Sequence, residues 1–244
     1  MNLPIKATRL LLRSLMESLN EAVFPEYTDI PVEEALQNAR KALEQLCGTD
    51  ATEQFLERVP AIAQLLKEDV EAIAGNDPAT DSLQEIVYCY PAVTAMVHYR
   101  VAHELDALGV GVIPRMLTEN AHSVTGIDIH PQARIGHHFA IDHGTGVVVG
   151  QTAVIGNHVT LYQGVTVGAK NFKYDESGRP RTVPRHPVIE DNVTVYSNAS
   201  LLGRITIGEG SVIGGNVWLT HSVPPYSRIL QGRTHEEFLD GAGI

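Results

Sequence analysis

The chain has 244 residues, enough for one large domain or two smaller ones that bury a core without disulfides or metals. Its 18 lysines and arginines face 29 aspartates and glutamates, and the formal net charge of −11 argues against a nucleic-acid partner, which would need a basic face. No apolar run approaches the roughly 18 residues of a membrane span, and residues 1–6 lack a signal-peptide core, so we expect a cytoplasmic protein with no membrane partner.

The N-terminal half follows a helical pattern. From Pro91 to Leu108 apolar side chains recur at the spacing that forms one stripe on a helix, with a proline suited to its first turn and Gly109 to its end. Further helices are predicted between prolines and a Gly-Asn-Asp-Pro turn, over residues 6–19, 32–47, 60–74 and 113–122. We therefore expect residues 1–122 to form an all-α domain.

Beyond Gly126 the sequence repeats with a period of six residues. Six residues make one short strand and one corner, three such units close a coil, and equivalent residues of successive coils stack at about 4.8 Å. The pattern predicts a three-sided parallel β-helix over residues 123–229, with a loop over 168–187 and a C-terminal tail over 230–244. Ile, Leu or Val occupies all thirteen expected interior positions: Ile129, Ile135, Ile141, Val149, Ile155, Leu161, Val167, Ile189, Val195, Leu201, Ile207, Ile213 and Leu219.

Four short motifs accompany the repeats. They are Asp77-Pro78, Asp128-Ile129-His130-Pro131, the stretch Asp142-His143-Gly144-Thr145-Gly146-Val147-Val148-Val149-Gly150, and Arg185-His186-Pro187. With them the chain resembles, over nearly its whole length, the serine O-acetyltransferases among the hexapeptide-repeat acyltransferases. The resemblance implies an α+β protein, an all-α N-terminal domain followed by a left-handed parallel β-helix. It also implies transfer of acetyl from acetyl-CoA to the L-serine hydroxyl, giving O-acetyl-L-serine and CoA in cysteine biosynthesis.

His143 lies where the register of the repeats slips by two residues, so the coil must bulge and turn side chains out of its regular wall. Acetyl transfer needs a base for the hydroxyl proton, and imidazole titrates near neutral pH. We predict that His143 is this base and returns the proton to the departing thiolate. The resemblance implies that Asp128, roughly one coil earlier, holds the ring; an aspartate that only caps its own turn is the alternative.

Free serine is a zwitterion, so its pocket must supply both signs of charge. The resemblance implies Asp77 and Asp142 for the ammonium and hydroxyl end, and Arg185 and His186 for the carboxylate. The last two are expected to act across an interface on His143 of another chain, which makes the active unit a homotrimer or a dimer of trimers. Asp77 could instead be only a turn residue before proline.

The coenzyme A positions carried over by the resemblance are Ala169, Lys170, Ser197 and Gly215, with the pantetheine arm along exposed coil backbone. The loop over 168–187 has five basic and two acidic residues, and we predict that it helps to hold the CoA phosphates; a solvated loop would explain the same charge. Its sequence departs from the family's Gly-Gly-Thr-Gly-Lys type. Apart from the cosubstrate acetyl-CoA, no cofactor and no metal is expected.

The chain ends in Gly-Ala-Gly-Ile, and Ile244 is its last residue. Chains of the resembling family end in Gly-x-Gly-Ile, and their terminal carboxylate enters the active site of O-acetylserine sulfhydrylase. The resemblance therefore implies Ile244 as the residue that binds this partner. It also implies L-cysteine as a feedback inhibitor, since cysteine differs from serine by one atom.

Three other functions fit parts of the pattern. An acetyltransferase for another small hydroxyl acceptor, such as homoserine, would keep His143 and lose the zwitterion pocket. A γ-type carbonic anhydrase uses the same prism with zinc-binding histidines, and His138 and His143 are five residues apart, but no third ligand falls at a matching spacing. A prism that has lost catalysis is the third alternative.

Overall fold

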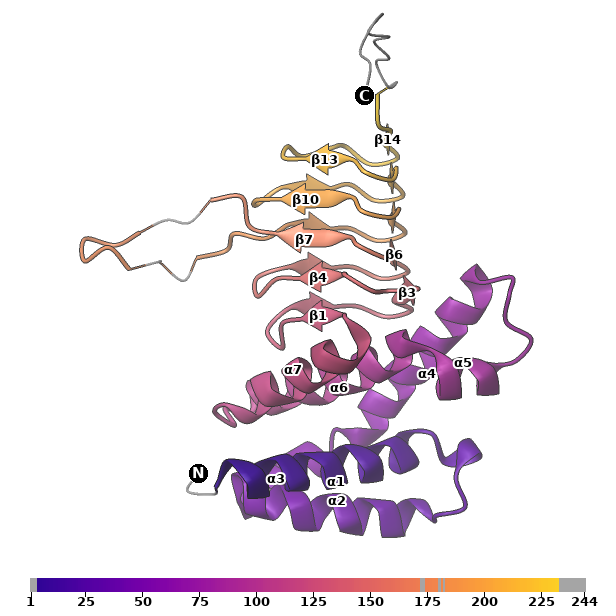
Figure 1. Cartoon of the computed structure of the whole chain (residues 1–244), viewed down its shortest axis with the longest axis vertical. Helices are drawn as coiled ribbons and strands as arrows, with labels where there is room; N and C mark the ends of the chain where they lie inside the picture. The colour runs from indigo at the N-terminus through magenta and orange to yellow at the C-terminus, as the bar shows by residue number, and fades with distance from the viewer. Residues whose placement is uncertain (1–3, 172–173, 180, 182, 233–244) are drawn as a thin grey trace, which may run out of the picture.

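The computed structural model describes residues 4–171, 174–179, 181 and 183–232. Helices form the N-terminal part and short strands coil into a tall prism above them (Figure 1). The predicted order, a helical region followed by a hexapeptide-repeat parallel β-helix, is confirmed. The α-helices are α1 (Ile5–Val23), α2 (Val32–Cys47), α3 (Thr49–Leu56), α4 (Val59–Asn76), α5 (Leu83–Cys89), α6 (Pro91–Ala107) and α7 (Ile113–Thr125), with a 3₁₀ turn η1 (Pro25–Tyr27).

Each predicted helix has a counterpart, whereas α3 and α5 were not predicted. The α3 helix begins directly after Gly48, whose φ of 81° ends α2. Ser82 caps α5, because its hydroxyl accepts a hydrogen bond from the Glu85 amide at 3.2 Å. The domain boundary drawn from the sequence, between residues 122 and 123, lies inside α7. No helix of the described residues is long and apolar enough to cross a membrane.

The prism has three faces, each a parallel sheet. The first sheet has the order β1-β4-β7-β10-β13, the second β2-β5-β8-β11, and the third β3-β6-β9-β12-β14. All thirteen predicted interior residues are buried, none more than 9% exposed, so the repeat gave the register correctly. The strands are β1 (Asp128–Ile129), β2 (Arg134–Ile135), β3 (Ala140–Asp142), β4 (Val148–Val149), β5 (Val154–Ile155), β6 (Thr160–Tyr162), β7 (Thr166–Gly168), β8 (Val188–Ile189), β9 (Thr194–Val195), β10 (Ser200–Leu202), β11 (Thr206–Ile207), β12 (Val212–Ile213), β13 (Trp218–Leu219) and β14 (Arg228–Ile229).

Two corners of the prism carry the predicted site residues. We call the corner where the chain passes from the third sheet to the first the His143 corner. The corner where it passes from the first sheet to the second is the His186 corner. After β7 the chain leaves the prism at the His186 corner, and the described residues 174–179 lie away from the prism (Figure 1).

A buried ion pair fastens the helices to the first coil of the prism. Arg100 in α6 and Asp69 in α4 are 5% and 2% exposed, and their side chains meet at 3.0 Å. The guanidinium also donates to the carbonyls of Ile135 and Gly136, and Asp69 accepts from the Phe139 amide. The end of α4 is thereby held close to β3.

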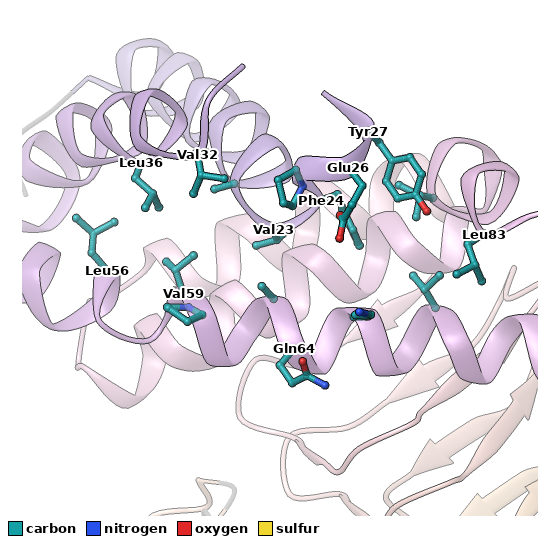
Figure 2. A pocket seen from close by; sticks show the side chains of 17 residues that line it. Val23, Phe24, Glu26, Tyr27, Val32, Leu36, Leu56, Val59, Gln64 and Leu83 are labelled. Atoms are coloured by element: carbon teal, nitrogen blue, oxygen red, sulfur yellow. The ribbon is translucent and has the colours of Figure 1, made fainter. Parts of the chain in front are cut away.

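An apolar pocket of about 590 Å³ lies within the helical part, between α1, α2, α4 and α5 (Figure 2). Its walls are mainly aliphatic and aromatic, for example Val23, Leu36 and Val59, with Lys67 and Glu26 among the few polar residues. None of the predicted site residues lines this pocket, so it is separate from the candidate site.

Candidate active site

A second pocket, of about 610 Å³, lies where the end of α4 and the α5–α6 junction meet the first coil at the His143 corner. Three of the predicted site residues line it: Asp77, Asp142 and His143. Tyr90, Cys89 and Thr145 also line it. The structure thus brings both proposed ammonium-binding carboxylates to the proposed base.

The slip of the repeat explains why His143 faces outward. The residue has a left-handed backbone (φ 55°), and Gly144 and Gly146 follow with φ values of 87° and 82°. A Cβ at residue 144 would lie 2.9 Å from a methyl carbon of Ile141, so only glycine fits there. The imidazole is 74% exposed, and its Nε2 lies 3.8 Å from Oδ1 of Asp142.

Asp77 follows the last residue of α4 and is held at both oxygens. Its Oδ1 accepts a hydrogen bond from the Ala79 amide at 2.8 Å, and its Oδ2 accepts one from the Tyr90 hydroxyl at 2.6 Å. The Tyr90 hydrogen bond is the main cause that lowers the pKa of Asp77, and the charge of His143 adds to it. The same hydrogen bond raises the pKa of Tyr90 to about 12.

Asp128 lies on the outer side of the first sheet and pairs with a helix rather than with His143. Oδ1 of Asp128 is 3.7 Å from the Arg115 guanidinium, which also pairs with Glu119. Between Asp128 and His143, both among the described residues, there is no hydrogen bond or ion pair. The ligand atoms of Glu119, His122 and Asp128 lie within 4.8 Å of one another, but Arg115 already supplies a cation to both carboxylates.

Arg185 and His186 lie at the other corner, where Thr152 holds both. Thr152 Oγ1 accepts from the amides of Arg185 and His186 at 2.9 and 3.2 Å, and the Thr152 amide donates to Nδ1 of His186 at 3.1 Å. Because Nδ1 accepts, the ring proton is on Nε2. Burial first, and the charge of Arg185 second, lower the pKa of His186 to about 4, so the ring is neutral near pH 7. The Arg185 guanidinium donates to the side chain of Gln151 at 2.9 Å.

The predicted CoA positions divide between the same two corners. Ser197 and Gly215 stack at the His143 corner, where the Asn216 amide donates to the Ser197 carbonyl at 2.9 Å. Ala169 and Lys170 follow β7 at the His186 corner. Ile244 lies outside the described residues. Within one chain, each half of the predicted site therefore occupies its own corner.

Two tyrosines near the pocket were not predicted. The register of β3 with β6 places Tyr162 beside Asp142, and the Tyr162 ring stacks on that of Tyr196 with centroids 4.9 Å apart. Burial and the nearby carboxylate of Asp142 raise the pKa of Tyr162. The repeat contained this signal, because residues 142, 162 and 196 each follow an interior aliphatic at equivalent positions.

The zinc alternative required His138 and His143 together. His138 instead stacks on His158, with ring centroids 4.5 Å apart, at the corner between the second and third sheets. His143 lies at a different corner of the coil. The geometry therefore gives no support to a shared zinc between these two histidines.

The fold and a family model define the class of protein. The model described as bacterial transferase hexapeptide (six repeats) matches residues 186–221, which lie in the upper coils of the prism and have the six-residue repeat of that class. The chain is 48% identical over 228 residues to the plasmid serine acetyltransferase of Synechococcus elongatus, covering 93% of this chain and 72% of that protein. The chain belongs to the serine acetyltransferase family.

Solved structures of similar proteins agree with this family. Serine acetyltransferase isoform 3 of Entamoeba histolytica, in complex with cysteine, superposes with a TM-score of 0.82 at 33% identity, covering 96% of this chain and 94% of that chain. A serine acetyltransferase in complex with CoA superposes with a TM-score of 0.67 at 27% identity, covering 88% of this chain and 80% of that one.

Proposed function

We propose that the chain transfers the acetyl group of acetyl-CoA to the hydroxyl of L-serine, as a cytoplasmic enzyme of cysteine biosynthesis. The observation that carries the proposal is the pocket in which Asp77 and Asp142 lie beside His143. Two carboxylates suit an ammonium group, and an exposed imidazole suits the removal of a hydroxyl proton. Family membership and the solved relative bound to CoA support the acetyl donor.

His143 takes the proton from the serine hydroxyl as that oxygen attacks the thioester carbonyl. When the carbon–sulfur bond breaks, the imidazolium gives the proton to the leaving thiolate, which departs as free CoA. Asp142, whose Oδ1 lies 3.8 Å from the His143 Nε2, is the proposed ligand of the serine ammonium group beside the reacting hydroxyl. Asp128 is the proposed orienting carboxylate. Asp128→Asn should therefore lower kcat more than it raises the serine KM, and Asp142→Asn should do the reverse.

The carboxylate half of the serine site comes from a neighbouring protomer. Arg185 and the neutral His186, with its proton on Nε2, are both donors suited to a carboxylate. They lie at a different corner from His143, and the predicted CoA positions divide in the same way. In a cyclic homotrimer the His186 corner of each protomer meets the His143 corner of the next, which completes three equivalent sites. We further propose that two trimers pair through their helical regions.

Two regulatory partners follow from the same chemistry. L-cysteine carries the charges of serine and competes for its pocket as feedback inhibitor; the Entamoeba relative was solved in complex with cysteine. O-acetylserine sulfhydrylase binds the C-terminal Ile244 through its free carboxylate. Deletion of Ile244 should abolish copurification with the sulfhydrylase, and unchanged binding would refute this contact.

The decisive assay measures thiol release from acetyl-CoA with serine or homoserine as acceptor. We expect serine to be preferred and His143→Ala to lose about two or more orders of magnitude in kcat. His158→Ala, at an exposed histidine on the corner between the second and third sheets, is the matched control and should keep normal turnover. Near-normal turnover of His143→Ala would overturn the mechanism, and a preference for homoserine would overturn the acceptor.

A further inference from the structure

Tyr90 connects the helices to the pocket at one specific atom. It directly follows the last residue of α5 and precedes Pro91, the first residue of α6. Its hydroxyl donates a hydrogen bond to Oδ2 of Asp77 at 2.6 Å, while the Ala79 amide donates one to Oδ1. Both oxygens of Asp77 are therefore held, and Tyr90 and Asp77 line the same pocket as His143.

A hydrogen bond from a phenol to a carboxylate stabilises the ionised carboxylate and fixes its direction. This bond is the largest cause of the lowered pKa of Asp77, and Tyr90 itself stays protonated because its pKa is raised to about 12. The titratable groups around the pair are His143, Asp142 and Tyr162 on the prism and Glu85 and Cys89 on α5. Among these groups, His143 stabilises the ionised form of Asp77 through its charge.

We infer that Tyr90 is a positioning residue for amino-acid binding, whose hydroxyl aims the Asp77 carboxylate at the ammonium group of serine. The inference rests on the proposed function, because it takes Asp77 as the ammonium ligand. Tyr90 acts through Asp77 and does not contact the hydroxyl of serine or the thiol of cysteine. It therefore affects serine and cysteine equally, and acetyl-CoA very little.

The test is Tyr90→Phe, which removes one oxygen and keeps the ring. The serine KM should rise about tenfold, since hydrogen bonds to charged groups have about that effect. The inhibition constant of cysteine should rise in parallel, while kcat and the acetyl-CoA KM change less than about twofold. Tyr88→Phe is the matched control, because Tyr88 lies two residues away, is 59% exposed and donates only to the Tyr27 carbonyl.

Two further readouts separate this role from a general packing effect. In Tyr90→Phe the pKa of Asp77 rises, so serine affinity is lost at a higher pH on the acid side than in the wild type. In an Asp77→Asn background, Tyr90→Phe should raise the serine KM no further, because the negative charge that Tyr90 positions is gone. Thermal unfolding of each variant verifies that the fold is intact.

The outcomes distinguish this inference from the proposed function. A normal serine KM and acid limb in Tyr90→Phe, together with a raised KM in Asp77→Asn, would overturn the role of Tyr90 and leave the function standing. Additive effects in the double variant would also overturn it. If the wild-type enzyme does not acetylate serine at all, the proposed function itself fails.

Discussion

Gly150 is predicted to be irreplaceable because the His186 ring lies against it. A Cβ at residue 150 would lie 2.9 Å from Cε1 of that ring and closer still to Cδ2 and Nε2. The ring cannot easily move, since its Nδ1 accepts the Thr152 amide at 3.1 Å and also lies 2.8 Å from the Thr152 hydroxyl. Gly150→Ala must therefore displace His186 or the coil beneath it.

Overpacking of this kind costs about 1–3 kcal/mol. In a protein of this size that corresponds to a fall in Tm of about 3–10 °C. Displacement of Nε2 would also remove the proposed hydrogen bond from His186 to the serine carboxylate, which should raise the serine KM about tenfold or more. Calorimetric unfolding and thiol-release kinetics measure the two effects separately.

Gly75→Ala is the control for Gly150→Ala. Gly75 is inside α4, a Cβ there would have nothing within 4 Å, and alanine is preferred over glycine in helices by up to about 1 kcal/mol. Its Tm should stay the same or rise. A Gly150→Ala enzyme with wild-type Tm would refute the packing argument, and a lowered Tm with a normal serine KM would refute the role of His186.

Two further predictions concern stability. The folded pKa of His186, about 4, lies below its unfolded value, so its contribution is present above about pH 6.5 and is lost as the pH falls toward 4. Between pH 7 and 4.5 the wild type should lose about 2–3 kcal/mol more unfolding free energy than His186→Gln; an equal loss in both would contradict a shielded imidazole. Arg100→Met leaves the carboxylate of Asp69, 2% exposed, without its cation and should cost about 3–5 kcal/mol in urea unfolding. The control is Arg13→Met, at an exposed ion pair with Glu17, which should cost less than about 1 kcal/mol. Similar losses of unfolding free energy in Arg100→Met and Arg13→Met would refute the stabilising role of the buried ion pair between the helices and the prism.

The sequence predicted the prism well because its interior is read from one repeating position. A buried aliphatic every six residues leaves little choice of register, and the slip at His143 is visible as a break in that count. The missed helices α3 and α5 have only 8 and 7 residues. Helices of two turns show too little periodicity to be recognised, and Gly48 indicates a helix end rather than a new start.

The site was only partly predictable for a different reason. The residues of the slip are adjacent in sequence, so His143 and Asp142 were found together. Contacts such as Tyr90 with Asp77 arise when α4, α5 and α6 pack on the first coil, and no local spacing encodes them. The pairing of Asp128 with Arg115 was missed similarly, because it depends on how α7 enters the prism.

A site shared between protomers is tested most directly by mixing inactive chains. We predict that His143→Ala and the double variant Arg185→Ala/His186→Ala are each inactive alone. Co-expressed in equal amounts, they should form mixed trimers in which one of the three sites combines an intact His143 with an intact neighbouring Arg185 and His186, so that about a quarter of the sites of all trimers are intact. Serine-dependent thiol release should then return to about a quarter of the wild-type rate. No recovery in verified mixed trimers would contradict a shared site.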